Sequence, residues 1–122
     1  MKISLRLNQY LELEKLGIGA FAPLSNFMSE TEFQSVCDTM RLPTGDPFPI
    51  PVVFDVDRKT AKSAENAQRI ELFYLGVLVG EIIPESIYTC NKESVARQIF
   101  GTNEKQHPGV QMFYNYGEYF IG

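Results

Sequence analysis

Apolar residues recur along the chain in two spacings, one typical of strands and one typical of helices. The strand pattern consists of short runs of β-branched and aromatic residues between Gly, Pro and Asn. It predicts strands at Met1–Leu7, Ile50–Val56, Arg69–Tyr74, Val77–Ile83, Ile87–Cys90 and Val110–Ile121. The last run is interrupted at residues 115–117 and can supply one or two strands. Leu75-Gly76 joins the third and fourth runs, and the glycine predicts a hairpin turn.

Helical spacing is clearest over about Glu30–Arg41. Ser29 and Glu32 have the spacing of a capping box, in which each side chain accepts a hydrogen bond from the other residue's backbone N–H. The i, i+3, i+4, i+7 spacing of one buried face is present at Phe33, Val36, Cys37 and Met40. This segment is therefore predicted to be a helix with one side in the core.

Two further helices are predicted at Gln9–Leu16 and Lys92–Phe100. Each follows an asparagine that can act as N-cap, Asn8 or Asn91, and each ends at a glycine, Gly17 or Gly101. The segment Asp57–Asn66 is polar and contains alanine. It fits either one helical turn or a mobile loop, and disorder is expected there before anywhere else in the chain.

The connector Phe21–Met28 is unusually apolar for a loop. Loops normally run over the surface and are polar, so this one is predicted either to pack inward or to present its side chains to a partner. Gly17, Gly19 and Pro23 argue against a continuous helix or strand through it.

Short strands separated by turns at intervals of about ten residues are typical of a small barrel or sandwich. We therefore expect an α+β fold, mainly β, in which two or three short helices cap or plug a strand-built shell. No internal repeat or low-complexity tract divides the sequence, and residues 1–122 are predicted to form one domain.

Charge and composition narrow the classes of function. The net charge is −4 and no Lys/Arg cluster is present, which argues against a nucleic-acid interface. No apolar run approaches the roughly 18 residues of a membrane span, and the first residues, Met1–Arg6, do not resemble a secretory leader. Cys37 and Cys90 lack the spacing of a metal or redox motif. A soluble cytoplasmic domain is therefore expected.

Few residues are placed for catalysis or ligand binding. His107 is the one histidine and precedes Pro108-Gly109, so we interpret it as a turn residue whose ring satisfies a nearby backbone group. A small enzyme or sensor that uses His107 is the alternative with the least support. Asp46, Asp55 and Asp57 lack a ligand-dense loop and are interpreted as solvated carboxylates. No catalytic residue, cofactor or metal ligand is assigned.

Several motifs carry a resemblance to a known family. Gly19–Met28 is similar to the G-A-F-S-P-L-x-G-F-M signature of ATP sulfurylases (sulfate adenylyltransferases). Further similar segments follow in the family's order at Met40–Pro43, Pro49–Val56 and Phe100–Val110. The resemblance covers nearly the whole of this chain, but it corresponds only to the amino-terminal, PUA-like domain of the family's enzymes. It implies a PUA-like pseudobarrel and a context of sulfate activation.

The same resemblance implies that catalysis lies elsewhere. The family's catalytic domain carries a Q-x-R-N-P-x-H-x-x-H motif with two histidines, whereas this chain has one histidine altogether. A scaffold role is therefore expected, by docking on a catalytic domain, on a protein partner or on another copy. The candidate interface residues are Phe21, Pro23, Leu24, Phe27, His107, Tyr119 and Phe120. A free-standing PUA-like module that binds RNA or a small ligand is the alternative hypothesis.

Overall fold

The computed structural model describes residues 1–122, which form five helices and six short strands. The helices are α1 (Leu7–Gly17), α2 (Glu30–Thr39), α3 (Arg58–Ala64), α4 (Lys92–Phe100) and α5 (Pro108–Tyr114). The strands are β1 (Lys2–Ser4), β2 (Asp55–Val56), β3 (Ile70–Tyr74), β4 (Val77–Ile82), β5 (Ile87–Tyr88) and β6 (Tyr119–Ile121). The mixed α+β class is confirmed, although five helices are present where the sequence predicted two or three. None of them has the length and apolar character that crossing a bilayer requires.

The strands form two separate three-stranded sheets. In the first, β3 lies between β1, which is parallel to it, and β4, which is antiparallel. In the second, β6 lies between β2 and β5 and is antiparallel to both. No strand pairing joins the two sheets, so they do not close into a barrel. The predicted hairpin is confirmed, with Leu75 and Gly76 both at positive φ in the turn between β3 and β4.

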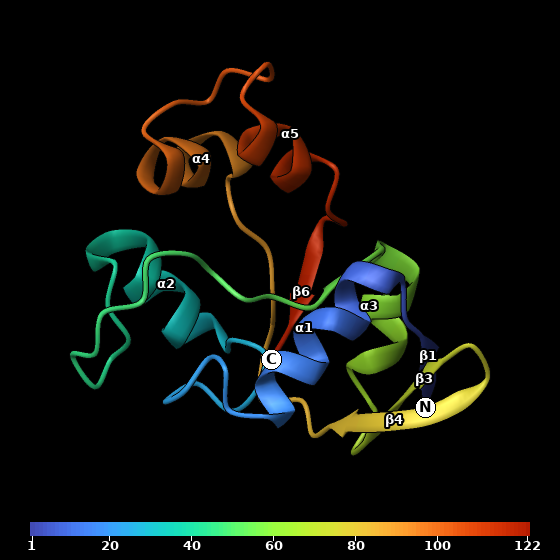
Figure 1. Cartoon of the computed structure of the whole chain (residues 1–122). Helices are drawn as coiled ribbons and strands as arrows, with labels where there is room; N and C mark the ends of the chain where they lie inside the picture. Colours follow the sequence, from blue (N-terminus) through green and yellow to red (C-terminus); the bar gives the residue numbers. More distant parts are fainter.

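Strand β6 of the second sheet lies near the middle of the molecule (Figure 1). Helices α4 and α5 form a lobe at one end, and β6 runs from this lobe into the body of the molecule (Figure 1). Helix α1 lies across the front, near α3 and the β3–β4 hairpin (Figure 1). Gly80 of β4 has no side chain, so a Cβ placed there would lie 3.1 Å from Leu13 Cδ2. This close approach lets α1 pack directly on the hairpin.

The apolar loop Phe21–Met28 packs mainly inward. Leu24, Phe27 and Met28 are buried, and the Phe27 ring lies against Phe54 with 5.3 Å between centroids. The Met28 backbone N–H donates to the Val52 carbonyl at 3.0 Å. Its own carbonyl accepts a 2.7 Å bond from the Tyr88 hydroxyl. The loop is therefore part of the core, as one of the two sequence interpretations predicted.

The capping signals of α2 and α4 are confirmed. Ser29 and Glu32 form both bonds of the capping box. Asn91 caps α4 through Ser94, and Gly101 ends that helix in the left-handed conformation. The predicted buried face of α2 is correct for Phe33, Val36 and Cys37 but wrong for Met40. Met40 is the left-handed C-cap of α2, and its side chain is 48% exposed because the chain leaves the helix there.

Two predicted boundaries near the amino terminus are wrong. The first strand covers only Lys2–Ser4, and α1 begins at Leu7 instead of Gln9. Arg6 precedes the helix, and its backbone N–H is satisfied by Gln9 Oε1 at 3.0 Å. Because this pair already closes the first turn, Asn8 lies inside the helix and does not cap it.

The polar segment after β2 is an ordered helix, so the expectation of disorder there is wrong. Asp57 caps α3 by accepting a bond from the Thr60 N–H at 2.7 Å. Ala61 and Ala64 are buried, and they give this short helix a face that packs on the body. The burial of these two alanines, together with the N-cap hydrogen bond of Asp57, thus stabilises the helix despite its otherwise polar composition.

Two predicted strands are also corrected. Residues 110–114 belong to α5, because Pro108 occupies its first turn and His107 precedes it as the N-cap. Only Tyr119–Ile121 of the predicted carboxy-terminal strands is present. In the run Ile50–Val56, only Asp55–Val56 pairs with another strand. The preceding residues from Val52 are buried but belong to no strand, whereas Ile50 is half exposed.

Gly117 offers a test of the junction between α5 and β6. A Cβ at this position would lie 2.4 Å from the Val56 carbonyl oxygen, and backbone there cannot move without disturbing β2. We expect Gly117→Ala to lower the free energy of unfolding by more than about 2 kcal/mol in urea denaturation. Gly17→Ala is the matched control, since nothing lies within 4 Å of a Cβ there. Equal stability of the two variants would contradict this packing.

Candidate functional site

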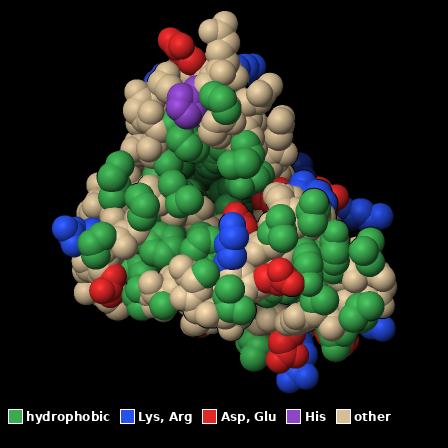
Figure 2. Space-filling model, viewed as in Figure 1, with side chains coloured by type: hydrophobic (Ala, Val, Ile, Leu, Met, Phe, Trp, Pro, Cys, Tyr) green, Lys and Arg blue, Asp and Glu red, His purple; other side chains and the backbone are tan.

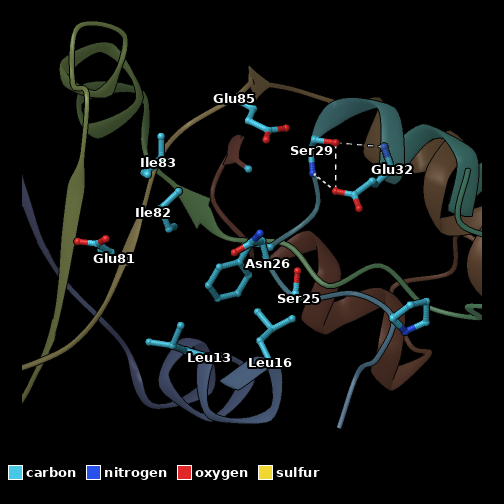
Figure 3. Close-up of a pocket in the computed structure, with 13 residues that line it drawn as sticks. Leu13, Leu16, Ser25, Asn26, Ser29, Glu32, Glu81, Ile82, Ile83 and Glu85 are labelled. Carbon is cyan, nitrogen blue, oxygen red and sulfur yellow. Dashed lines mark hydrogen bonds between the residues drawn. The ribbon is translucent and has the colours of Figure 1, made fainter. Parts of the chain in front are cut away.

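A cavity of about 580 Å³ lies between the apolar loop, α1 and the end of β4 (Figure 3). Leu13 and Leu16 of α1 form one wall (Figure 3), and Phe27 of the loop also lines the cavity. Ile82 and Ile83 form the opposite wall, from β4 and the residue after it (Figure 3). The polar lining comes from Ser25, Asn26, Ser29, Glu32, Glu81 and Glu85, with Pro23 and Gly122 completing it.

The charge of this lining is negative. Glu32, Glu81 and Glu85 are its only ionisable residues, and no lysine or arginine lines the cavity. Glu32 is held by the Ser29 N–H at 3.0 Å, and Glu81 forms an exposed ion pair with Arg69 at 3.3 Å. A phosphate or sulfate group placed here would meet carboxylates and no countercharge, so the cavity is unsuited to nucleotide or sulfate binding.

A second polar centre surrounds Asp55, which is 4% exposed. Both of its carboxylate oxygens accept bonds from Arg6 Nη2 at 2.6 Å. Gln9 Nε2 donates to Asp55 Oδ1 at 3.2 Å and to the Asp55 carbonyl at 2.9 Å. The Gly117 N–H donates to Oδ2 at 2.7 Å. These bonds satisfy the buried carboxylate and join α1, β2 and the α5–β6 turn.

Glu12 lies on α1, one turn beyond Gln9, and is partly buried. Burial, and secondarily the charge of Asp55, raise the pKa of Glu12 to about 7, while Lys15 acts in the opposite direction. Burial also raises the pKa of Tyr116 to about 12, with Glu12 and Asp55 adding to the effect and Arg6 opposing it. Glu12 and Tyr116 therefore lie close enough to Asp55 to feel its charge, while the Arg6 guanidinium is bonded to Asp55 itself. The arrangement is a stability element with a built-in pH dependence.

The thiols and carboxylates do not form a metal centre. No group of three or more His, Cys, Asp or Glu side chains in residues 1–122 is arranged to hold a metal ion. Burial raises the pKa of Cys37 to about 12 and that of Cys90 to about 11. Because the thiolate is the reactive form, both cysteines are poor nucleophiles near neutral pH.

The seven residues predicted as an interface fall into two groups. Leu24, Phe27 and Phe120 are at most 3% exposed, and they contribute to the core of this domain. Phe21, Pro23, His107 and Tyr119 remain at least partly accessible. Pro23 lines the cavity, whereas His107 lies in the α4–α5 lobe (Figure 2, purple). The structure therefore does not gather the accessible members into one patch.

His107 acts as the N-cap of α5. Its Nδ1 accepts bonds from the Gly109 N–H at 3.1 Å and the Val110 N–H at 3.4 Å. Its ring also lies against Phe100, with 5.4 Å between centroids. The sequence interpretation, that the ring satisfies a nearby backbone group, is confirmed.

The polar centre at Asp55 was not identified from the sequence, and the interpretation of Asp55 as a solvated carboxylate is wrong, because its side chain is buried and bonded within the domain. One signal was present, because Asp55 stands inside an apolar run and a buried carboxylate needs donors. Arg6 and Gln9, three residues apart, supply them from the start of α1. Arg6 and Asp55 are 49 residues apart in the sequence, so no local pattern indicates that they form a pair.

Comparisons with known proteins agree on one kind of domain. A family model described as a PUA-like domain matches residues 1–122. The sulfate adenylyltransferase of Thermococcus onnurineus is 35% identical over 112 residues, which are 92% of this chain and 29% of that protein. That of Pyrococcus abyssi is 33% identical over 121 residues, which are 99% of this chain and 31% of that protein.

A solved structure described as a hexameric APS kinase from Thiobacillus denitrificans superposes with a TM-score of 0.66 at 22% identity. The superposition covers 74% of this chain and 18% of that chain. The PUA-like fold expected from the sequence is thus confirmed. The chain spans about 30% of the length of the sulfate adenylyltransferases it matches.

Glu12 predicts a pH-dependent stability. Because its pKa in the folded chain is raised from 4.5 to about 7, the folded state binds the proton more tightly than the unfolded state, and stability falls as pH rises through that window. We expect Glu12→Gln to raise the free energy of unfolding by about 1–3 kcal/mol at pH 8 and to change it little at pH 4. Urea denaturation across this range measures both. Glu14→Gln, on the exposed side of α1, should keep the wild-type slope.

The cap at His107 gives a separate test. His107→Ala should lower the free energy of unfolding by about 1 kcal/mol, because two N–H groups of α5 lose their acceptor. His107→Asn should retain most of the stability, since asparagine is a good N-cap. If both variants lose the same amount, the contact with Phe100 and not the cap is what the histidine provides.

Proposed function

Because the chain belongs to the PUA-like domain family, we propose that it is a non-catalytic docking domain of a sulfate adenylyltransferase-like protein. This proposal rests on one observation, namely how much of each relative the chain matches. The chain matches 29% and 31% of two sulfate adenylyltransferases and is itself matched over 92% and 99% of its length. A domain that accounts for under a third of an enzyme leaves the larger part for catalysis.

The charge of the main cavity supports the same proposal. Adenylyl transfer to sulfate requires positive charge around phosphate and sulfate groups. The cavity instead has three carboxylates and no basic residue. Within this proposal the chain supplies no catalytic residue and serves sulfate activation in the cytoplasm by supporting the part that does.

Docking requires an accessible surface. Of the residues predicted for it, Phe21, Pro23, His107 and Tyr119 are available, and we retain them as contributors. Phe21 packs edge-on against Phe48 with 6.2 Å between ring centroids. The Nζ atom of Lys15 lies over the Phe21 ring, 5.8 Å from its centroid. Phe21 is therefore a partly ordered aromatic that a partner can cover without a large loss of side-chain entropy.

Two measurements test the proposal together. The purified chain should show no sulfate-dependent exchange of pyrophosphate into ATP, with the whole Thermococcus onnurineus relative as the active control. The chain should also bind the part of that relative left after removal of its matched region. Exchange activity in the purified chain would overturn the non-catalytic role, and absence of binding would overturn the docking role.

A further inference from the structure

Helix α1 has apolar residues on two opposite sides. Leu16 faces the core on one side, next to the buried but polar Gln9. On the other side, Leu7 is 58% exposed, Leu11 43% and Ile18, directly after the helix, 80%. At 100° per residue these three positions lie within about 40° of one another, opposite Gln9 and Leu16. We call Leu7, Leu11 and Ile18 the α1 ridge.

The α1 ridge is unfavourable in a domain surrounded by water. A surface helix normally carries polar residues opposite its core face, and a helix that is apolar all round is usually buried. Single exposed apolar residues need no explanation, but three aligned along one helix do. The polar residues on either side, Glu14 and Lys15, have opposite charges. The ridge therefore presents an electrically balanced, apolar surface.

One other exposed apolar residue extends this surface. Met112 of α5 is 55% exposed and lies near the start of α1, because it lines the same cavity as Arg6 and Asn8. Between α1 and α5 lies a cavity of about 370 Å³ with Arg6, Asn8, Gln111, Asn115 and Tyr116 in its lining. Figure 2 shows the same side of the molecule as Figure 1, hollowed below the α4–α5 lobe and rich in apolar side chains.

We propose that the α1 ridge binds an apolar segment of a further domain, the one that makes up the rest of the sulfate adenylyltransferase relatives outside the region matched here. This inference rests on the proposed function and adds a docking surface to the accessible residues retained there. The relatives carry about 70% of their length outside the region that matches here, which is ample for a covering domain. A second copy is the alternative occupant, which the sedimentation measurement described below distinguishes.

The assigned surface differs from the one expected from the sequence. Leu24, Phe27 and Phe120 already pack within the domain and have little area to offer. The ridge residues offer large side chains that are free to be covered. Their number is small against the roughly 20–30 residues per side of a standard interface, so neighbouring residues such as Met112 must contribute to the contact.

The test compares two leucines that differ in location. Leu11→Glu places a charge in the middle of the ridge, and Leu75→Glu places the same charge at the hairpin tip, where the side chain is 85% exposed. Both sites are exposed enough for the fold to persist, which far-UV circular dichroism checks. Binding is measured by calorimetry against the Thermococcus onnurineus relative without its matched region. We expect Leu11→Glu to weaken binding by at least about tenfold and Leu75→Glu by less than about twofold.

Each outcome decides a different point. Wild-type binding that Leu11→Glu leaves unchanged would overturn the ridge as the docking surface while the docking function stands. No wild-type binding would overturn the docking function itself, and with it this inference. Analytical sedimentation of the chain alone tests whether a second copy covers the ridge. A concentration-dependent dimer that Leu11→Glu abolishes would show that a second copy covers the ridge, and would contradict the occupant assigned here.

Discussion

The buried carboxylate of Asp55 is the constraint on which the arrangement of the elements depends. It accepts hydrogen bonds from a guanidinium before α1, an amide within α1 and a backbone N–H before β6. Removing any one donor would leave a buried charge short of partners, which costs far more than an exposed ion pair contributes. The packing of α1 on β2 and the position of the α5–β6 turn are thus tied to the same side chain.

This constraint has a cost at Glu12. The helix that supplies Arg6 and Gln9 also brings a second carboxylate into the same neighbourhood, and burial opposes its ionisation. The pair resembles arrangements that enzymes use to hold a proton, but nothing around it is placed to act on a substrate. Here the perturbed carboxylate is better understood as a by-product of joining three segments at one point.

Local signals allowed much of the fold to be predicted. Ser29 with Glu32, Asn91 with Gly101, and Leu75-Gly76 each specify a cap or turn through neighbouring residues alone. Helix α5 was missed because its aromatic residues favour strands, although Pro108 at its start and the spacing of Val110 and Phe113 indicate a helix. The cavity and the Asp55 centre could not be predicted, since both are assembled from segments far apart in the chain. The α1 ridge is visible in the sequence only as apolar residues, and which side of the helix meets the core is decided by tertiary packing.

The absence of a side chain at Gly80 has a further consequence for the main cavity. Leu13 lines that cavity and also rests on the β4 backbone at Gly80. The separation of the cavity's two walls is therefore set partly by a residue that does not line it. A change as small as one methyl group at this position would act as a spacer, altering the width of the opening while every residue facing it stayed the same. In this fold, a substitution outside the cavity lining can thus change the dimensions of the cavity without changing the side chains that line it.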